Sequence, residues 1–379
     1  MFNYINKIDT QLLDVVSTQG NKKIECVIYA NNFCNLKKIL DNNNSIPLPF
    51  INAYAVKLDA NKVYEYAKNN VVKYITKQSK VFAQIDVSRD ILNVNKFYEQ
   101  NYSGKGVTVA IIDTGISLHT DFTIVRKRII KFVDLINDKN MPYDDNGHGT
   151  FVASILAGNG IASGGRYSGI APECNIISIK ALEKNGETSS SNILRAMQWV
   201  YDNKDKYNIK VVCMSFGSTP SGRNDPLQMG AEVLWNSGVT VVAAAGNSGP
   251  ERESIKSPGI SPKIITVGGI DDKRVDGKYN TKSFEIAKFS SRGPAGYFYK
   301  PDCLAPAIDI TGASVKGGYT TMSGTSVATP MVAGIATLMY SKNNQISPDQ
   351  IKIKLLRNCK QIVFDRNQEG FGLVSISII

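Results

Sequence analysis

The stretch Val109-Ala110-Ile111-Ile112-Asp113-Thr114-Gly115-Ile116 joins an unbroken apolar run to an aspartate and a glycine turn. An apolar run without polar alternation is typical of a parallel strand that is buried on both faces. Similar runs follow at residues 176–181, 211–215, 239–244 and 264–267. Helical periodicity marks residues 149–158, 191–203, 226–236 and 325–340. This alternation predicts an α/β fold, a three-layer sandwich around a mostly parallel sheet, with functional groups at the carboxyl ends of the strands.

The composition is that of a globular protein of 379 residues, with 42% hydrophobic and 20% charged residues. At this length we expect one large domain and a smaller one. The formal charge is +11, yet the sequence holds no dense run of Lys and Arg and no basic amphipathic helix. We therefore predict a basic, solvated surface and no nucleic-acid partner. No apolar run reaches the roughly 18 residues of a membrane span, so no membrane partner is predicted either.

Six cysteines are scattered along the chain with no C-x-x-C pair, which argues against a zinc site. The first nine residues contain an aspartate and amides where a secretory signal would have an apolar run, so no Sec export is implied. We therefore expect free, mostly buried thiols in a cytoplasmic protein. Export by a route other than Sec stays open.

Residues 20–85 have the pattern of a separate α+β unit. Strand patterns occupy residues 24–30, 51–57 and 71–75, a further strand is possible near Val81, and helical patterns occupy residues 33–40 and 59–69. The order is similar to β-α-β-β-α-β, and the pattern loosens around residues 84–93. We therefore predict two domains, residues 1–84 and residues 85–379.

Two candidate functional residues are Asp113, which ends the first apolar strand, and His148, which stands between two glycines at the start of a helix of small residues. A poorly solvated Asp needs a partner, although taken alone it is equally suited to capping a turn. A lone histidine is more often structural than catalytic, but the two glycines leave this ring approachable. His119, the second of the two histidines, is predicted to be a surface loop residue with no role.

The most specific stretch is GYTTMSGTSVATPMVAG at residues 318–334, in which Ser326 opens a helix of small residues. The helix N-terminus would direct its free N–H groups and positive partial charge at a developing anion; an isolated Ser would instead indicate an N-cap. Asn247 ends another apolar strand and is suited either to an oxyanion hydrogen bond or to a turn. Each residue alone leaves its structural interpretation open, but the order Asp, His, Asn, Ser favours one function.

This combination resembles the subtilisin-like serine protease family over about residues 85–360. Further stretches carry the resemblance: residues 168–172 (SGIAP), 214–217 (MSFG), 255–259 (IKSPG), 289–294 (FSSRGP) and 301–307 (PDCLAPA). Within the family, residues 158–169 and 247–250 are most similar to bacterial intracellular alkaline serine proteases rather than to secreted subtilisins.

The resemblance implies a serine endopeptidase in which Asp113, His148 and Ser326 form the catalytic triad. Ser326 Oγ would attack the peptide carbonyl, His148 would carry the proton to the leaving amine, and Asp113 would orient the imidazole. The Asn247 amide and the Ser326 backbone N–H would hold the oxyanion. This chemistry requires no cofactor, and the expected partner is a peptide or protein substrate.

The resemblance also indicates which residues bind the substrate. Two backbone segments are expected to pair with an extended peptide: Ser215, Phe216 and Gly217, and Ala244, Ala245 and Gly246. Lys256 stands where the family more often has a small or uncharged residue lining the specificity pocket. If its ammonium reaches the pocket floor, acidic side chains at the cleaved residue would be better accepted; if it points to solvent, the pocket stays apolar.

By the same resemblance, residues 1–84 are similar to the family's propeptide, a ferredoxin-like domain that assists folding and acts as an intramolecular inhibitor. A permanent extra domain is the alternative. Self-cleavage, which would make the chain a zymogen, is expected near residues 80–87. Calcium commonly stabilises the family through the loop after the histidine helix, but residues 158–169 lack acidic ligands and include Arg166. A calcium ion at this loop is therefore not supported, and other calcium sites stay open.

Two other functions stay in view. One is a dedicated protease that processes a single precursor, which digestion of casein would distinguish from a general degrading enzyme. The other is a catalytically silent pseudoprotease that acts as a binding scaffold. Every candidate catalytic position holds a residue suited to the reaction, which argues against the scaffold.

Overall fold

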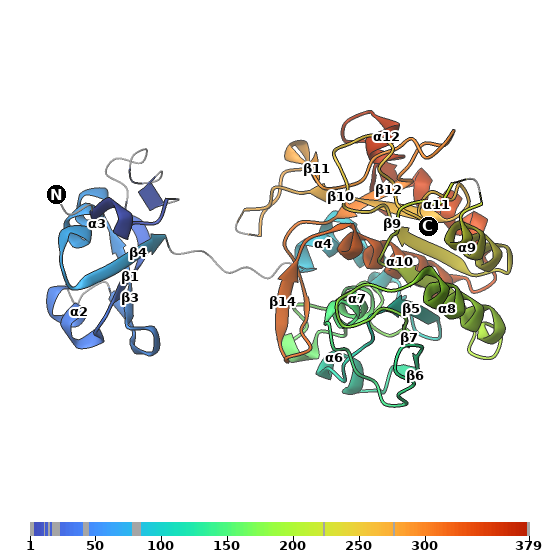
Figure 1. The fold of residues 1–379 in the computed structure, drawn as a ribbon, viewed down its shortest axis with the longest axis horizontal. Coiled ribbons are helices and arrows are strands. Elements are labelled where there is room, and N and C mark those ends of the chain that lie inside the picture. The colour runs from blue at the N-terminus through green and yellow to red at the C-terminus, as the bar shows by residue number, and fades with distance from the viewer. Residues whose placement is uncertain are drawn as a thin grey trace. The chain divides into compact units, whose positions relative to one another are not determined.

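The computed structural model describes residues 4–10, 12–13, 16, 23–40, 45–77, 85–222, 224–275 and 277–376. The chain divides into two compact units, Met1–Val81 and Phe82–Ile379 (Figure 1). Each unit has a hydrophobic core of its own. Within the segment expected for self-cleavage, residues 80–84 lie outside the described residues, as does the possible strand near Val81.

Unit 1, Met1–Val81, contains an antiparallel sheet with the strand order β2-β3-β1-β4. The strands are β1 (Ile24–Ala30), β2 (Ser45–Leu48), β3 (Ala53–Leu58) and β4 (Val72–Lys77). The helices whose full extent is described are α2 (Phe33–Ile39) and α3 (Ala60–Lys68), with 3₁₀ turns at Tyr4–Lys7 and Pro49–Ile51. Alternate residues of β1 are buried and share a core with Leu36 and Val63 from the two helices. The order β-α-β-β-α-β is that of a ferredoxin-like domain.

Strand β4 corresponds to the strand pattern at residues 71–75, whereas strand β2 has no counterpart among the strand patterns of the sequence. Its four residues are half-buried or exposed, so no buried alternation marks them. Pro47 also argues against a strand interior. Because β2 lies at the edge of the sheet beside β3, the missing N–H of the proline is tolerated there.

Unit 2, Phe82–Ile379, is built on a ten-stranded sheet with the main order β15-β16-β12-β10-β9-β8-β5-β7-β6. All neighbouring pairs from β6 to β16 are parallel. β15 and β11 add antiparallel pairs. The strands are β5 (Thr108–Asp113), β6 (Ile129–Asp134), β7 (Asn175–Lys180), β8 (Ile209–Met214), β9 (Thr240–Ala244), β10 (Ile265–Asp271), β11 (Glu285–Ile286), β12 (Cys303–Pro306), β15 (Cys359–Lys360) and β16 (Leu373–Val374). β5 and β9 are buried along their whole length, as the unbroken apolar runs predict.

Helices cover the sheet of unit 2 and make it a three-layer α/β structure (Figure 1). α7 (His148–Ala157) packs on α10 (Thr325–Lys342), and α8 (Ser190–Asn203) packs on α9 (Pro226–Asn236). The remaining elements are α4 (Ile85–Ile91), α5 (Asn95–Glu99), α6 (Thr120–Thr123), α11 (Pro348–Arg357), α12 (Arg366–Glu369), the hairpin β13 (Ile310–Ala313) and β14 (Tyr319–Met322), and 3₁₀ turns at Ile161–Ser163 and Thr281–Ser283. The predicted fold class is therefore confirmed.

Small residues let α10 run through the middle of unit 2. The helix is buried around nearly its whole circumference and contacts β8, β9, β10 and β12. A Cβ atom at Gly334 would lie 2.5 Å from Ile170 Cβ, so only glycine permits this close approach. This packing, together with hydrogen bonds of Thr325 with Gly246 and Asn247, fixes the start of α10 at the carboxyl end of β9.

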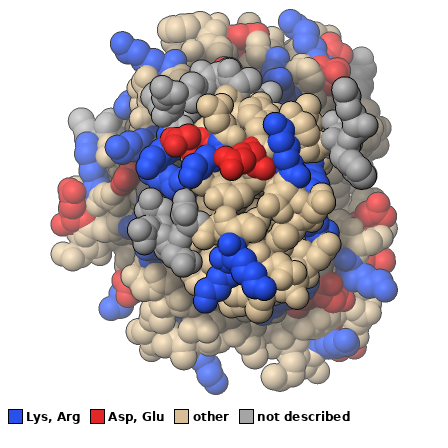
Figure 2. Space-filling view, turned by 90° about the vertical axis from the view of Figure 1, so that its left-hand side faces the viewer, with Lys and Arg blue, Asp and Glu red and all other residues tan. Residues whose placement is uncertain are grey.

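On the face shown in Figure 2, Lys and Arg side chains alternate with acidic and uncharged ones. No helix in the described ranges is both long and apolar enough to span a membrane.

All six cysteines are free thiols, and Cys26, Cys174, Cys213 and Cys303 are buried. Burial raises the pKa of Cys26, Cys174 and Cys213 to about 12, so these thiols stay protonated and unreactive at neutral pH.

Candidate active site

Asp113 and His148 form a direct pair. Asp113 is the last residue of β5 and is 1% exposed, whereas His148 is the first residue of α7 and its side chain is 27% exposed. His148 Nδ1 lies 2.8 Å from Asp113 Oδ1, which also accepts a 2.8 Å hydrogen bond from the Thr114 backbone N–H. With Nδ1 held by the carboxylate, the Nε2 atom is left as the proton-accepting position.

The charge of the aspartate changes the basicity of the histidine. Burial lowers the pKa of His148, but the negative charge of Asp113 and its hydrogen bond outweigh burial, with a further contribution from Asp144. The net effect raises the pKa above its ordinary value of 6.5. This half-buried imidazole next to a carboxylate is therefore a stronger base than a free one.

The structure shows why glycine is required on either side of His148, which the sequence did not reveal. Gly147 caps α7 with φ +107°, a conformation that other residues rarely adopt. A Cβ atom at Gly149 would lie 2.2 Å from the Gly115 carbonyl oxygen and 3.2 Å from Asp113 Cβ. The two glycines therefore allow α7 to approach β5 closely enough for the histidine to reach Asp113.

Asp144 supports this pair and was not identified from the sequence. Its Oδ1 accepts hydrogen bonds from Thr114 Oγ1 (2.8 Å) and from the Gly147 N–H (2.8 Å). Its Oδ2 accepts from the Thr150 N–H and hydroxyl (2.8 and 2.7 Å). Burial raises the pKa of Asp144, but these hydrogen bonds outweigh it and lower the pKa. Asp144 therefore stays ionised and ties the start of α7 to the residue that follows Asp113.

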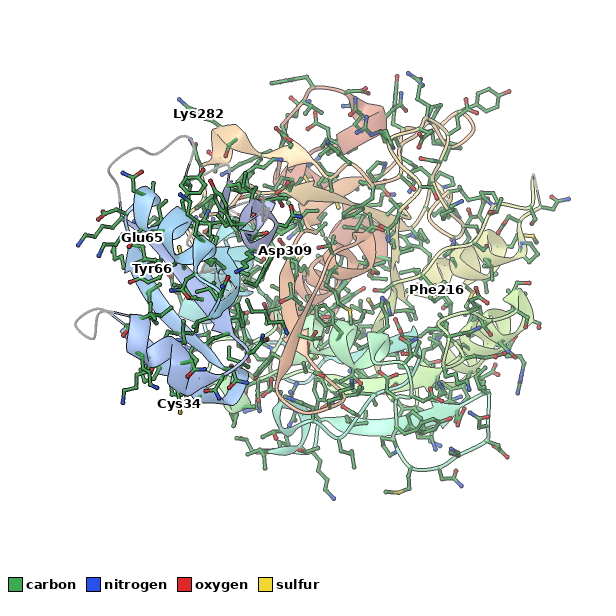
Figure 3. The ribbon with its side chains drawn as sticks, turned by 60° about the vertical axis from the view of Figure 1, so that its left-hand side comes forward. Cys34, Glu65, Tyr66, Phe216, Lys282 and Asp309 are labelled. Carbon is green, nitrogen blue, oxygen red and sulfur yellow. The ribbon has the colours of Figure 1, made fainter. Side chains whose placement is uncertain are left out.

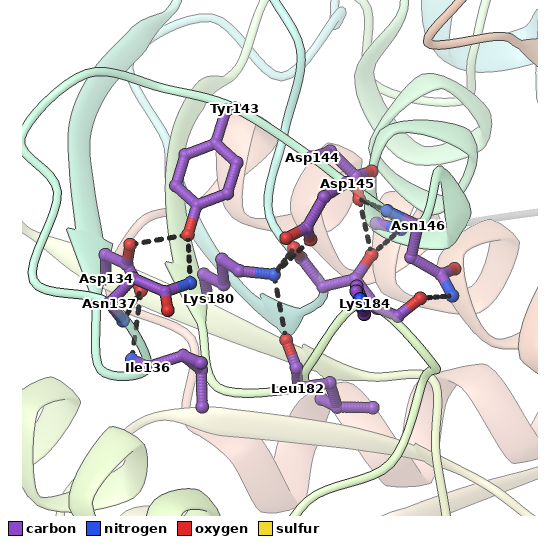
Figure 4. Close-up of polar contacts among 12 residues, drawn as sticks. Asp134, Ile136, Asn137, Tyr143, Asp144, Asp145, Asn146, Lys180, Leu182 and Lys184 are labelled. Carbon is purple, nitrogen blue, oxygen red and sulfur yellow. Dashed lines mark hydrogen bonds and ion pairs between the residues drawn. The ribbon is translucent and has the colours of Figure 1, made fainter.

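Lys180 binds the segment that precedes His148, next to Asp144 (Figure 4). It is the last residue of β7, pairs in register with Asp113, and is fully buried. Its ammonium donates to Asp145 Oδ1 (2.6 Å) and to the carbonyls of Thr114 (2.7 Å) and Leu182 (3.0 Å). A buried lysine with three acceptors is fully satisfied. Its role is to fix the turns that follow β5 and β7.

Ser326 and Asn247 flank one small space at the start of α10. A Cβ atom at Gly324 would lie 3.1 Å from Ser326 Oγ and 3.2 Å from Asn247 Nδ2. Gly324 has φ +154° and precedes the first turn of α10. A glycine at this position therefore keeps open the space between the hydroxyl and the amide, and the N–H groups of the helix N-terminus lie beside it.

Thr325 sets the orientation of the Asn247 amide. Asn247 Oδ1 accepts hydrogen bonds from both the backbone N–H and the hydroxyl of Thr325, each 2.9 Å long. The amide oxygen is thus occupied, while Nδ2 makes no hydrogen bond within the described residues. Two free N–H donors on the amide therefore face the space beside Ser326, as an oxyanion site requires.

His148 and Ser326 begin two helices that pack on one another. His148 is the first residue of α7, and Ser326 is the second residue of α10. No hydrogen bond between their side chains is formed in the described part of the chain. Hydrogen bonds between a nucleophile and its base are often long before substrate binds. The structure thus gathers all four predicted residues at one end of the sheet, with the Asp113–His148 contact already made.

The two predicted substrate segments differ. Ser215, Phe216 and Gly217 follow β8, Phe216 being labelled in Figure 3. Their backbone groups make no backbone hydrogen bond in the described structure, but Ser215 is buried, so Phe216 and Gly217 are the two that remain available to a peptide. By contrast, Ala245 donates to Val267 and accepts from Lys256, and the Gly246 carbonyl accepts from Ser291. Contrary to expectation, the backbone groups of residues 245–246 are not free to pair with a peptide, because they are hydrogen-bonded to other segments of the same chain. These residues therefore form one wall of the site. Ala244 lies within β9 itself.

His119 corrects one prediction. It is 7% exposed rather than a surface residue. Its Nδ1 accepts from the Asp121 N–H (3.2 Å), which caps α6, and its Nε2 lies 3.0 Å from the Gly318 carbonyl oxygen. The sequence did not show this because Gly318 is 199 positions away along the chain. His119 links α6 to the β13–β14 hairpin.

The loop expected to hold calcium in the family does not fit a hard cation. The nearest carboxylate, Asp121, accepts from the Ala162 N–H with Oδ1 (3.0 Å) and from the Tyr319 hydroxyl with Oδ2 (2.7 Å). The buried Arg128 guanidinium donates to the carbonyl oxygens of Asp121 and Ala157. Both oxygens of the Asp121 carboxylate are thus occupied by hydrogen bonds. The positive charge of Arg128 is bound to carbonyl oxygens of the kind that a calcium ion would need as ligands. Within the described ranges no cluster of three His, Cys, Asp or Glu residues is arranged for a metal.

Comparison with known proteins agrees with this geometry. Residues 104–373 match the Peptidase_S8 profile, described as the subtilase family. The chain belongs to the subtilase family. The matched part is therefore a subtilase-type serine protease domain, a hydrolase, as the sequence predicts.

Individual subtilases show how far the likeness extends. Serine protease AprX of Bacillus subtilis (strain 168) is 43% identical over 304 residues, which cover 73% of this chain and 66% of AprX, slightly less than two thirds of its length. Subtilisin DY of Bacillus licheniformis is 31% identical over 289 residues, covering 76% of this chain and 95% of that protein. Among solved structures, a cold adapted subtilisin-like serine proteinase aligns with a TM-score of 0.60 at 30% identity, covering 73% of this chain and 92% of that one.

Proposed function

We propose that this chain is a serine endopeptidase in which Ser326 is the nucleophile, His148 the general base and acid, Asp113 the residue that orients the histidine, and Asn247 an oxyanion donor. The observation that carries the proposal is the Asp113–His148 hydrogen bond of 2.8 Å at the start of α7, a helix that packs on α10, whose second residue is Ser326. Subtilase membership supports the same assignment.

In the proposed reaction Ser326 Oγ attacks the carbonyl carbon of the substrate while His148 Nε2 takes the hydroxyl proton. Asp113 stabilises the imidazolium that forms. The oxyanion accepts hydrogen bonds from Asn247 Nδ2 and the Ser326 N–H, donors held in place before the substrate arrives. His148 then gives its proton to the leaving amine, and an acyl-enzyme remains. Water, deprotonated by His148, attacks this ester and releases the second product with the serine restored.

We also propose that unit 1 is a propeptide that the enzyme removes from itself. Unit 1 and unit 2 have separate hydrophobic cores, so a cut between β4 and α4 would leave both cores intact. Unit 1 has the ferredoxin-like sheet order β2-β3-β1-β4, which is the fold that the resemblance implies for such a propeptide. Before the cut, unit 1 acts as an intramolecular inhibitor.

Replacement of the nucleophile tests both parts of this proposal. Ser326→Ala should reduce casein and peptide hydrolysis by roughly 10⁶-fold and should accumulate as the uncut 41.4 kDa chain, whereas the wild type should yield a shorter product in intact-mass measurement. Wild-type enzyme added to the Ser326→Ala chain should restore the cut. Normal casein hydrolysis by Ser326→Ala would exclude Ser326 as nucleophile. An active wild-type chain that stays uncut would exclude self-processing but would leave the assignment of Ser326 as nucleophile in place.

A further inference from the structure

The space next to the candidate oxyanion donor contains a lysine that the proposed mechanism does not use. Lys256 lies between the two predicted substrate segments. A Cβ atom at Gly217 would lie 2.5 Å from Lys256 Cβ, and a Cβ atom at Gly246 would lie 2.4 Å from Lys256 Cγ. The aliphatic stem of the lysine therefore fills a slot whose two walls lack side chains at the points of contact.

The backbone around Lys256 is fixed to both walls. The Lys256 N–H donates to the Ala245 carbonyl (2.9 Å). Ser257 exchanges two backbone hydrogen bonds with Ser218, each 2.9 Å, and is fully buried. The chain therefore holds the lysine stem in the slot rather than letting it swing out with a mobile loop. A long stem packed on apolar surface with its charged end free is the usual arrangement for a half-buried lysine.

The ammonium of Lys256 has no hydrogen bond or ion pair in the described structure. Asp225, the buried acid bonded to Ser257, is already saturated. Its Oδ1 accepts from the Gln228 N–H and its Oδ2 from the N–H and hydroxyl of Ser221. The slot thus presents a positive charge without an anion, next to Gly246 and hence to the amide of Asn247.

We infer that Lys256 determines specificity for an acidic side chain, glutamate or aspartate, at the residue whose carbonyl is cleaved. The inference deepens the proposed function and rests on it. The carboxylate approaches the free end of the lysine stem that fills the slot between Gly217 and Gly246, and its oxygens accept hydrogen bonds from the Lys256 ammonium. Glutamine has the same shape as glutamate but no charge. The difference in kcat/KM between a Glu and a Gln peptide therefore measures the effect of the ion pair. Hydrogen bonds to a charged partner in such a site correspond to about a 10- to 100-fold difference in kcat/KM.

The test compares four peptides that differ only at the cleaved residue, which is Glu, Gln, Leu or Lys. With the full chain, the wild type should cleave the Glu peptide about 10- to 100-fold faster than the Gln peptide, as kcat/KM. Lys256→Met, which keeps the stem and removes the charge, should bring the Glu/Gln ratio near one, and its rate on the Leu peptide, which makes no ion pair, measures any general loss of activity. Lys256→Arg should preserve the ratio, and Lys288→Met, at an exposed lysine, is the matched control.

A salt series on the wild type gives the same answer without any variant. The Glu/Gln ratio should fall as salt rises toward about 1 M, because the charge pair is screened. Equal rates for Glu and Gln in the wild type, or an unchanged ratio in Lys256→Met, would overturn the inference while leaving the protease intact. If the wild type cleaves none of the four peptides, the proposed function fails, and the inference fails with it.

Discussion

The two halves of the candidate site differ in how completely they are bonded. The acid–base half, Asp113 and His148, is joined by a direct hydrogen bond and supported by Asp144. The nucleophile half, Ser326 and Asn247, offers donors without acceptors: the amide oxygen of Asn247 is occupied by Thr325, and its Nδ2 is free in the described structure. One half is complete before substrate binds, and the other is completed by the substrate.

This difference shows where the structure fixes catalytic geometry. The two side chains that take up and hold the proton must keep one mutual orientation, and they are bonded to each other between β5 and α7. Groups that must bind a transient anion are oriented but left unsatisfied. Substitutions in the first half should therefore change the pH dependence, whereas substitutions in the second should change kcat at constant pH dependence.

Asp113→Asn, in the acid–base half, should have the largest effect on activity of the substitutions considered in this comparison. His148 must be neutral to accept a proton, so kcat/KM of the wild type should rise with pH through a midpoint above 6.5, in line with the raised pKa of His148. The substitution removes the charge that raises this pKa and leaves burial, which lowers it. The midpoint should therefore move down, and the rate should fall by roughly 10⁴-fold, the size of this effect in other Ser-His-Asp triads. A pH–rate profile with a peptide substrate measures both quantities.

The control for Asp113→Asn is the thermal unfolding midpoint, which shows whether the fold is retained. A folded Asp113→Asn variant with a rate within tenfold of the wild type and an unmoved pH midpoint would contradict the assignment of Asp113.

Asn247→Ala should impair the nucleophile half by a smaller factor. Loss of one oxyanion donor lowers kcat by about 10²- to 10³-fold. KM should change little, because the donor acts on the transition state rather than on the bound substrate, and the pH midpoint should stay where it is. Steady-state kinetics at several pH values check this. A raised KM with unchanged kcat would show instead that Asn247 binds substrate.

Asp144→Asn should have the smallest effect on activity. The charge of Asp144 contributes to the raised pKa of His148 less than Asp113 does, so the pH midpoint should fall by less than in Asp113→Asn, with a rate loss of up to about tenfold. Stability should also depend on this residue. Its pKa is lowered in the folded protein, so its contribution is present above its ordinary value of 3.8 and is lost as pH falls through the lowered folded value.

Two measurements check the Asp144 prediction, a pH–rate profile and urea unfolding at neutral and acidic pH. Asp144→Asn should lower neutral stability by about 1–3 kcal/mol, and its difference from the wild type should shrink on acidification. A pH midpoint that rises, or a stability difference that grows in acid, would contradict the role given to Asp144.

The sequence predicted the sheet and the four central residues because their signals are local. Unbroken apolar runs mark strands buried on both faces, and parallel strands end at one edge of the sheet, so Asp113 and Asn247 were expected at that edge. The motifs around His148 and Ser326 added the helix starts. The specific chemistry came from the family resemblance rather than from any single residue.

What the sequence missed depends on contacts between distant segments. The burial of His119 depends on the β13–β14 hairpin, and the occupation of Ala245 and Gly246 depends on Lys256 and Ser291. Thr325 precedes Ser326 and looked like part of a helix start, yet its bonds to the Asn247 amide appear only in three dimensions. Asp144, four positions before His148 in the motif DDNGHGT, carried a signal that could have been used.

Reaction with a fluorophosphonate probe, followed by mass mapping of the modified peptide, tests the central claim most directly. The account predicts one adduct per chain, on Ser326, absent in Ser326→Ala and formed far more slowly in His148→Ala. An unmodified Ser326 in the folded wild-type chain, or an adduct on another serine such as Ser323, would contradict it.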